Sequence, residues 1–347
     1  MSEIRTEDAS AAAALVGDRW AKLEGARILL TGCTGFLGGG LVETLLWANE
    51  QRGLGARVSV LTRDPDAARL RQPWLANEAV TFIGGDIATF PAPQSAFTHC
   101  IHGAAVAGVS LDDQDGAALS RTIVEGTRRC LAAAARAGVR EFLFVSSGAV
   151  YGPQPADVSA LSEESSQAPL GRTPQDRYAQ AKRAAEQLCL AEAGRLHPRI
   201  ARCFAFLGPG MPMDARYAAG NFIRDAVAGG PIRIEGDGAA VRSYLYSGDA
   251  AAWLWTILLS GENEGIYNVG SPDGVTISDL AHEVGREAGG VTVEIKGRPE
   301  SGPARRYVPS VGRAAAELGL RPTVTLPEAI RRTLSWARTS RGTVRAP

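Results

Sequence analysis

The sequence predicts an α/β fold, a doubly wound parallel sheet followed by a smaller C-terminal lobe. Short apolar stretches alternate with helical stretches along most of the chain, which is the order that builds a parallel sheet with helices on both faces. Some stretches, such as Phe142-Leu143-Phe144-Val145, are apolar throughout, as strands buried on both faces are. A glycine-rich turn directly follows the first apolar stretch.

That turn, at residues 32–38, has the spacing of a dinucleotide-binding loop. Gly32 permits a sharp turn off the strand, and Gly35 lets backbone amides approach a pyrophosphate with no Cβ in the way. Gly38 lets the next helix pack closely on the strand, and the N-terminus of that helix favours negative charge. A glycine-rich loop without a ligand is the alternative, but the flanking strand and helix favour dinucleotide binding. The cofactor contacts expected in the turn are Gly32, Thr34, Gly35, Phe36, Leu37 and Gly38.

The alternation places each element in order along the chain. Strands are expected at 27–31, 57–62, 80–83, 99–102, 141–146, 199–204 and 265–269. Helices are expected at 36–50, 65–71, 117–137, 174–195, 214–229, 248–260, 276–288, 311–318 and 326–338. Glycine- and proline-rich turns break the alternation after about residue 205. The expected domains are a leader helix at 1–24, a dinucleotide domain at 25–206 plus 241–271, a substrate lobe at 207–240 plus 272–340, and a tail at 341–347.

Composition narrows the class of protein. The 347 residues are 45% hydrophobic and 21% charged with a net charge of zero, so nothing indicates a nucleic-acid or membrane partner. Five widely spaced cysteines and four scattered histidines suggest reduced thiols and no metal site. The N-terminus is acidic, unlike a secretory signal, and no run of about 18 apolar residues could span a membrane. We therefore expect a cytoplasmic protein.

A tyrosine and a lysine four residues apart are candidate catalytic groups. Tyr178 and Lys182 lie in an expected helix, where side chains at this spacing share a face. A phenol has an ordinary pKa near 10, which is too high for acid–base work at neutral pH, and a neighbouring ammonium lowers it. The pair could therefore move a proton onto or off an alcohol or ketone oxygen, although such pairs also occur on solvated helix faces.

Two serines lie at the end of the buried strand that is expected at 141–146. Ser146 and Ser147 lie where substrates bind in doubly wound folds, at the carboxyl end of a strand. A serine hydroxyl there could hold a carbonyl oxygen against Tyr178. An ordinary serine turn is the alternative.

In this order, the glycine turn, the serine-bearing strand end and Tyr-x-x-x-Lys resemble the extended short-chain dehydrogenase/reductase family. More narrowly, the chain resembles the nucleotide-sugar epimerase/dehydratase branch over about residues 25–340. The resemblance implies a Rossmann fold, a nicotinamide cofactor and a nucleoside-diphosphate sugar substrate. It implies that Tyr178 is the general acid/base, that Lys182 binds the nicotinamide ribose, and that Ser147, four positions before Tyr151, is catalytic and contacts substrate.

The same resemblance implies further contacts. Asp86 and Ile87 match the segment whose acid contacts the adenine, and Ala104 and Ala105 match the loop that lines the phosphates and nicotinamide. Asn221 matches a substrate-contacting asparagine. Arg242 matches the arginine that binds the substrate pyrophosphate, and a planar guanidinium group is suited to binding a diphosphate. A surface salt bridge is the alternative role for Arg242. In the family, helices such as 117–137 and 174–195 form a four-helix bundle, which makes a homodimer plausible.

The end of the second strand bears on the choice of cofactor. An NAD-selective site usually has an acid there for the ribose, but this chain has Thr62 followed by Arg63, which could meet a 2′-phosphate. NADP is therefore favoured over NAD. NAD stays possible, because Arg63 could instead stack on adenine and Asp64 could serve the ribose.

Two small residues after Ser147 bear on the reaction. Dehydratases of this branch usually carry an Asp-Glu pair there to eliminate water, and this chain has Gly148 and Ala149. Without these two acids the site can still interconvert a carbonyl and an alcohol. We therefore favour reduction of a 4-keto-6-deoxy sugar at C4, with an NAD-dependent 4-epimerase as the alternative. A 4,6-dehydratase or a non-catalytic dinucleotide-binding protein is less favoured. The family often has an asparagine before Val-x-Gly-Thr, where this chain has Ile123-Val124-Glu125-Gly126-Thr127, and another near the end of the sixth strand, where it has Phe204-Ala205-Phe206. These differences point to an unusual sugar or binding pose.

Overall fold

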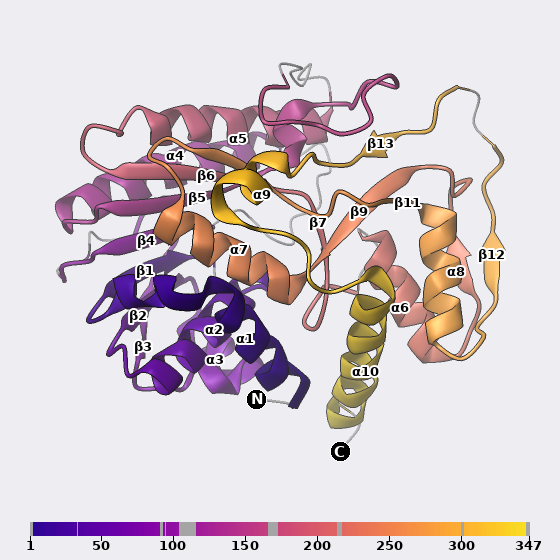
Figure 1. Ribbon diagram of the computed structural model, residues 1–347, viewed down its shortest axis with the longest axis horizontal. Coiled ribbons are helices and arrows are strands. Elements are labelled where there is room, and N and C mark those ends of the chain that lie inside the picture. Colours follow the sequence, from indigo (N-terminus) through magenta and orange to yellow (C-terminus); the bar gives the residue numbers. More distant parts are fainter. Residues whose placement is uncertain are drawn as a thin grey trace.

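A seven-stranded parallel sheet forms the centre of the protein in a computed structural model (Figure 1). The structure describes residues 3–32, 34–90, 93, 95–103, 116–165, 173–213, 217–299 and 302–344. The strands of this sheet are β1 (Arg27–Thr31), β2 (Arg57–Thr62), β3 (Val80–Gly84), β4 (His99–His102), β5 (Glu141–Ser147), β6 (His197–Cys203) and β10 (Ile266–Val269). Their order is β10-β6-β5-β4-β1-β2-β3, which confirms the doubly wound parallel sheet predicted from the sequence.

Helices cover both faces of the sheet and give it two separate cores. Successive side chains of a strand point to opposite faces, so Ile28 and Leu30 of β1 enter one core and Leu29 the other. On the first face lie α2 (Phe36–Arg52) and α7 (Ser247–Ser260), and on the second lie α4 (Gly116–Arg136) and α5 (Pro174–Leu190). Burial on both faces explains why these strands are apolar throughout.

The expected leader is a helix packed into the first core. Helix α1 (Glu3–Val16) and the 3₁₀ helix η1 (Gly17–Leu23) lie over α2 and α7 (Figure 1). The Trp20 side chain is fully buried, its indole nitrogen donates to the Ala13 carbonyl at 2.9 Å, and its ring centroid lies 5.4 Å from that of Trp255 in α7. Asp8 of α1 accepts a hydrogen bond from Tyr246 at 2.5 Å and pairs with Arg332 at 2.9 Å. The N-terminal segment therefore joins the sheet domain to the C-terminal lobe.

The C-terminal lobe has a third core between helices and short strands. Its helices are α6 (Ala218–Ala228), α8 (Ile277–Glu287) and α10 (Leu326–Val344). Strand β9 (Val241–Tyr246) pairs with β7 (Ala205–Leu207), β11 (Gly274–Thr276) and β13 (Arg306–Tyr307), while β8 (Ile232–Ile234) pairs with β12 (Val293–Ile295). The remaining elements are α3 (Pro65–Arg71), η2 (Pro73–Leu75), η3 (Gly148–Tyr151) and α9 (Gly312–Leu318).

Several element ends differ from the sequence expectation. Helix α5 ends at Leu190 rather than 195, because turns that include Gly194 lead into β6. Helix α10 continues to Val344, through residues expected to begin a tail, because no proline or glycine lies between Pro327 in its first turn and Gly342. Helix α6 begins at Ala218, and the expected start at 214 lies outside the described residues. The two-domain division stays a prediction, and β9 lies in the small sheet rather than the large one.

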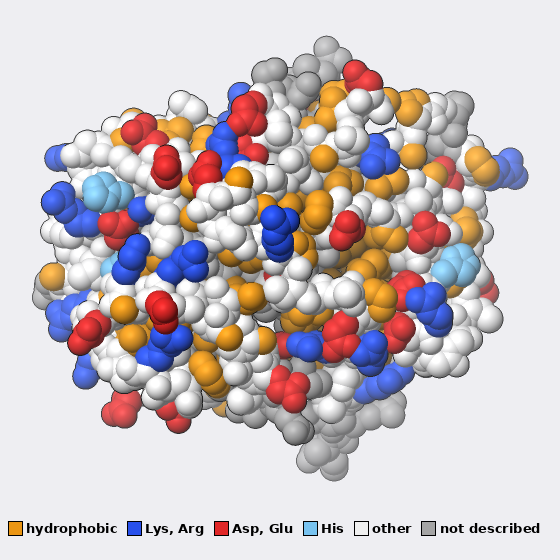
Figure 2. Space-filling model, viewed as in Figure 1, with side chains coloured by type: hydrophobic (Ala, Val, Ile, Leu, Met, Phe, Trp, Pro, Cys, Tyr) orange, Lys and Arg blue, Asp and Glu red, His pale blue; other side chains and the backbone are white. Residues whose placement is uncertain are grey.

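The surface shows no concentration of one charge on the visible face. Figure 2 shows acidic and basic side chains interspersed over this face, in keeping with the net charge of zero. Within the described part of the chain, no helix is both long and apolar enough to cross a membrane.

The burial of Trp20 predicts a large effect on stability. Trp20→Ala is expected to lower the free energy of unfolding by about 3–5 kcal/mol, the usual cost of truncating a buried aromatic side chain. Urea unfolding followed by circular dichroism measures it. Leu70→Ala, at a residue that is 82% exposed, is the control and should change little. Equal, small effects of both substitutions would show that η1 is not part of the cooperative core.

Candidate active site

The glycine turn between β1 and α2 has room for a negatively charged ligand. Gly32 has a φ of +75°, in the left-handed region that favours glycine. Gly35 precedes α2, and no atom lies within 4 Å of the position a Cβ would take there. No side chain caps α2, and its first turn contains no acidic residue. The turn therefore fits the pyrophosphate of a dinucleotide, which the helix N-terminus would bind through backbone N–H groups.

The three predicted catalytic residues meet at the carboxyl end of β5. Ser147 is the last residue of β5, and its hydroxyl accepts the Ala149 N–H at 3.2 Å. Helix α5 begins with a capping box between Thr173 and Asp176, which fixes where the helix starts. One turn further on, Tyr178 lies close enough to Ser147 for that hydroxyl to lower the pKa of its phenol. The Lys182 ammonium, on the same face of α5, donates to the Val145 carbonyl at 2.8 Å.

Burial determines the protonation of this pair. It raises the pKa of Tyr178 to about 12, with the Ser147 hydrogen bond acting in the opposite direction. It also lowers the pKa of Lys182 to about 8, and the ammonium lies 4.7 Å from the centroid of the Phe144 ring. The predicted lowering of the Tyr178 pKa by Lys182 is therefore wrong for the chain alone, because desolvation of the phenolate outweighs the favourable contacts. An oxidised nicotinamide ring carries a positive charge that would favour the phenolate.

A buried ion pair anchors α5 behind the catalytic pair. Glu186, one helical turn after Lys182, is 2% exposed and binds Arg202 of β6 through two hydrogen bonds of 2.8 and 3.1 Å. Its carboxylate also accepts the Ser146 hydroxyl at 2.5 Å, and Arg202 donates to the Tyr151 phenol at 3.0 Å. Such a bidentate pair fixes orientation as well as charge. Sequence reasoning missed Glu186 and Arg202, although the spacing from Lys182 places Glu186 on the catalytic face.

The other expected cofactor residues lie at the carboxyl ends of the neighbouring strands. Arg63 follows β2 and is exposed, and Asp86 follows β3, where its carboxylate accepts the Ala88 N–H at 2.9 Å. Ile87 is 8% exposed and packs so closely on α4 that a Cβ at Gly126 would lie 3.0 Å from its side chain. Ala104 and Ala105 lie outside the described residues.

A cavity of about 650 Å³ in the C-terminal lobe brings together two of the three predicted substrate residues, Asn221 and Arg242, but Ser147 does not line it. The Asn221 side-chain oxygen accepts a hydrogen bond from Arg224 at 2.9 Å, and Arg242 donates to the Val241 carbonyl at 2.8 Å. Arg233 and Arg305 also line the cavity, and sequence reasoning missed both. Three guanidinium groups around one cavity suit a diphosphate.

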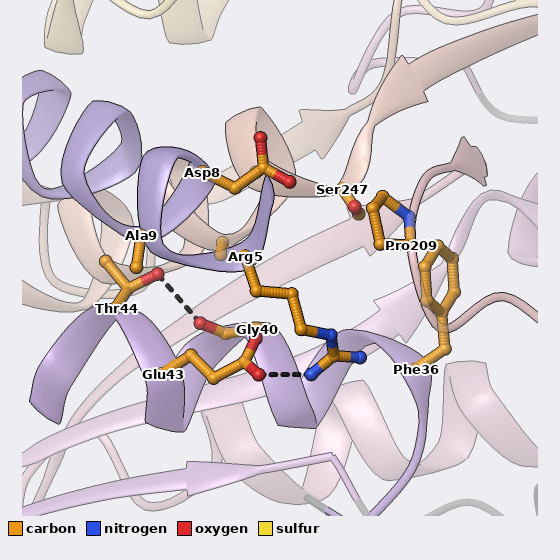
Figure 3. Close-up of a pocket in the computed structure, with 11 residues that line it drawn as sticks. Arg5, Asp8, Ala9, Phe36, Gly40, Glu43, Thr44, Pro209 and Ser247 are labelled. Atoms are coloured by element: carbon orange, nitrogen blue, oxygen red, sulfur yellow. Dashed lines mark hydrogen bonds and ion pairs between the residues drawn. The ribbon is translucent and has the colours of Figure 1, made fainter. Parts of the chain in front are cut away.

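A much smaller cavity, of about 30 Å³, lies where α1 and α2 approach the residues before α6. Figure 3 shows the Arg5 side chain extending from α1 to Glu43 of α2, with Phe36 beside Pro209. The volume suffices for a water molecule and not for a nucleotide. Helix α1 therefore packs against the start of α2 without leaving a second ligand site there. Among the described residues, no group of three or more metal-binding side chains could hold a metal ion.

The protein has a doubly wound α/β fold, and its glycine turn fits a dinucleotide. The chain belongs to the NAD dependent epimerase/dehydratase family, whose model matches residues 28–270, and this confirms the expected resemblance. It is 29% identical to dTDP-glucose 4,6-dehydratase of Streptomyces antibioticus over 325 residues, which cover 90% of this chain and 93% of the relative.

Two further proteins show the same relationship. UDP-glucuronic acid decarboxylase 6 of Arabidopsis thaliana is 30% identical over 309 residues, which cover 88% of this chain and 86% of the relative. The crystal structure of dTDP-glucose 4,6-dehydratase from Streptomyces venezuelae, which contains NAD, is similar with a TM-score of 0.77 at 28% identity. The similarity covers 91% of this chain and 98% of that one.

The lowered pKa of Lys182 predicts that this residue destabilises the fold near neutral pH. Below about pH 8 folding buries an ammonium, whereas the unfolded chain keeps it in water up to the ordinary pKa of 10.5. Lys182→Met should therefore raise the free energy of unfolding at pH 7, by up to about 3 kcal/mol. The gain should shrink as pH rises from 8 towards 10.5, because the unfolded wild-type lysine then also loses its proton.

Urea unfolding at pH 7 and at about pH 10 measures this difference. Lys22→Met is the matched control, because Lys22 is exposed and its ammonium also donates to a backbone carbonyl, that of Leu259, at 2.7 Å. Its effect should not depend on pH over this range. A similar loss of stability from Lys182→Met at both pH values would show that the contact with Val145 outweighs the cost of burial.

Proposed function

We propose that this protein is an NAD(P)-dependent oxidoreductase that reduces the 4-keto group of a nucleoside-diphosphate 4-keto-6-deoxy sugar. The observation that carries the proposal is the absence of a carboxylate beside Ser147. Gly148 and Ala149 follow it, and a Cβ at Gly148 would lie 2.6 Å from the Tyr307 phenolic oxygen. The site can therefore move one proton and one hydride but has no second acid–base pair next to Ser147 for elimination of water.

The protonation of Tyr178 favours the reducing direction. In the chain alone, a pKa of about 12 keeps the phenol protonated at neutral pH, which is the form that donates to a ketone oxygen. Ser147 would hold that oxygen, and Lys182 fixes the helix face on which Tyr178 lies. A reduced nicotinamide, when bound, would supply the hydride for C4, and Tyr178 would donate its proton to the C4 oxygen. An epimerase would instead begin with a deprotonated tyrosine that takes a proton from the sugar.

The cofactor that we propose is NADP, although the family is described as NAD-dependent. Thr62 ends β2 without a carboxylate, and the Asp64 carboxylate caps α3 by accepting the Ala67 N–H at 2.9 Å. The exposed Arg63 between them could pair with a 2′-phosphate. NAD is the alternative cofactor.

The C-terminal cavity supports a nucleoside-diphosphate sugar as the substrate. Arg242, Arg233 and Arg305 would neutralise the diphosphate, and Asn221 would contact substrate. The relatives are named for dTDP-glucose and UDP-glucuronic acid, which belong to this class of substrate. A homodimer through α4 and α5, and a cytoplasmic location, stay predictions.

A direct assay tests the proposed reaction. The purified protein is mixed with NADPH and dTDP-4-keto-6-deoxyglucose, and loss of NADPH absorbance is followed together with the mass of the sugar product. We expect equimolar NADPH loss and alcohol formation, abolished in Tyr178→Phe without loss of NADPH binding. Stoichiometric NAD released on denaturation, with sugar interconversion in the absence of added cofactor, would contradict reduction and indicate a 4-epimerase.

The position of Arg63 predicts how the protein distinguishes the two cofactors. Arg63→Glu should weaken NADPH binding about tenfold or more, because it replaces attraction to the 2′-phosphate with repulsion, and should leave NADH binding nearly unchanged. Fluorescence titration measures both affinities. Arg57→Glu, at the exposed opposite end of β2, is the matched control. Equal weakening of both cofactors by Arg63→Glu would show that Arg63 contacts a feature that they share.

A further inference from the structure

A buried histidine joins three elements beside the glycine turn. His102 is the last residue of β4 and is 1% exposed, so its imidazole finds its hydrogen-bond partners within the protein. Its Nδ1 lies 2.7 Å from the hydroxyl oxygen of Thr31, the last residue of β1, and its Nε2 lies 3.0 Å from that of Thr127 in α4. Thr31 directly precedes Gly32, where the turn begins. His102 therefore connects the start of the glycine turn to α4.

Hydrogen-bond counting assigns a direction to each of these contacts. A threonine hydroxyl has one proton, and that of Thr127 donates to the Ile123 carbonyl at 2.7 Å, since a carbonyl oxygen only accepts. The Thr127 oxygen must then accept in its contact with His102, which places a proton on Nε2. In a neutral imidazole the other nitrogen has no proton, so Nδ1 accepts from the Thr31 hydroxyl. The hydrogen bonds thus run in one direction, from Thr31 through His102 and Thr127 to Ile123.

The surroundings of the ring favour this neutral form. The ring centroids of Phe142 and Phe144 lie 6.4 and 5.5 Å from that of the imidazole, and the Lys182 ammonium lies 4.7 Å from the Phe144 centroid. A second buried cation there would be costly. Cys130 on α4 is a titratable group close to the ring, and its hydrogen bond with Cys100 lowers its pKa. An imidazolium paired with a Cys130 thiolate is the alternative, and it would carry protons on both nitrogens.

The contacts of His102 lie beside three segments that the sequence predicts to bind the cofactor. Thr31 is in register with His102, and its carbonyl accepts the Gly103 N–H at 3.0 Å, so the two strands stay paired up to the glycine turn. On α4, Gly126 directly precedes the threonine that binds the histidine, and a Cβ there would lie 3.0 Å from Ile87. The histidine therefore fixes the turn after β1 relative to the segments that follow β3 and β4.

We propose that His102 is a positioning residue for the dinucleotide, neutral and protonated on Nε2, and that it holds the glycine turn in the form that binds the pyrophosphate. It acts through Thr31 and need not touch the cofactor. The proposal rests on dinucleotide binding, and not on the choice between NADP and NAD or on the identity of the sugar. A turn without its support would have to be ordered on binding, and the cost of ordering lowers the affinity.

Nuclear magnetic resonance of the protein without cofactor reads the tautomer directly. The chain has four histidines, and in protein labelled with ¹⁵N in these rings the His102 signals are those lost in His102→Asn. At about pH 7.5 we expect a proton on Nε2 and none on Nδ1. A proton on Nδ1, alone or together with one on Nε2, would overturn the proposal.

Cofactor affinity tests the positioning role. His102→Phe keeps an aromatic ring and removes both nitrogens, and it should weaken NADPH binding about tenfold or more in a fluorescence titration. His102→Asn, which keeps a polar group near the place of Nδ1, should recover part of the affinity. His99→Phe is the matched control, because His99 is buried at the opposite end of β4 and also contacts a threonine hydroxyl, that of Thr98, at 2.8 Å. It should leave NADPH affinity nearly unchanged.

Thr31→Val separates positioning from a general loss of stability. It removes the hydroxyl and keeps the shape of the side chain, so it should weaken NADPH binding as His102→Phe does, and the double variant should lose little more. Equal affinity of the wild type and His102→Phe, or additive losses in the double variant, would overturn the proposal. A protein that shows the expected tautomer and losses but reduces no 4-keto sugar would keep this inference and refute the proposed function.

Discussion

The hydrogen bond from the buried Lys182 ammonium to the Val145 carbonyl ties helix α5 to the end of β5, and the site depends on that attachment. Because Tyr178 lies one turn earlier on the same face, fixing Lys182 also places the phenol at Ser147. The ion pair between Glu186 and Arg202 secures the next turn of the helix to β6. Burying the Lys182 ammonium costs free energy, so the fold is locally destabilised at the candidate catalytic residues.

Near this hydrogen bond, two aromatic side chains fill the space beside Gly148, where dehydratases of the family are expected to carry an acid. Gly148 leaves room for Phe204 and Tyr307, and each of these rings would clash with a side chain at 148. Gly148, Phe204 and Tyr307 are thus sterically coupled, because a side chain at 148 would clash with both aromatic residues. The coupling links the sheet domain to the lobe whose arginines line the large cavity, because Tyr307 is paired with Arg242.

Much of the sheet domain could be predicted from sequence, because its strands are locally apolar and its glycine turn and Tyr-x-x-x-Lys are local motifs. The short strands of the lobe could not be predicted from sequence. Strand β13, for example, has only two residues and is defined by its pairing with β9. Tyr307 was missed for the same reason, as its phenol reaches Gly148 only in the folded chain. The pKa of Tyr178 was predicted in the wrong direction, because its burial is a tertiary property that spacing does not reveal.

Hydride transfer from the cofactor to C4 of the sugar can be followed with a hydrogen isotope. NADPH labelled with deuterium at the transferable position of the nicotinamide is incubated with the protein and a nucleoside-diphosphate 4-keto-6-deoxy sugar in ordinary water. We expect the cofactor deuterium to appear at C4 of the sugar. A sugar product that carries no deuterium from the cofactor, or one that has lost water, would contradict it.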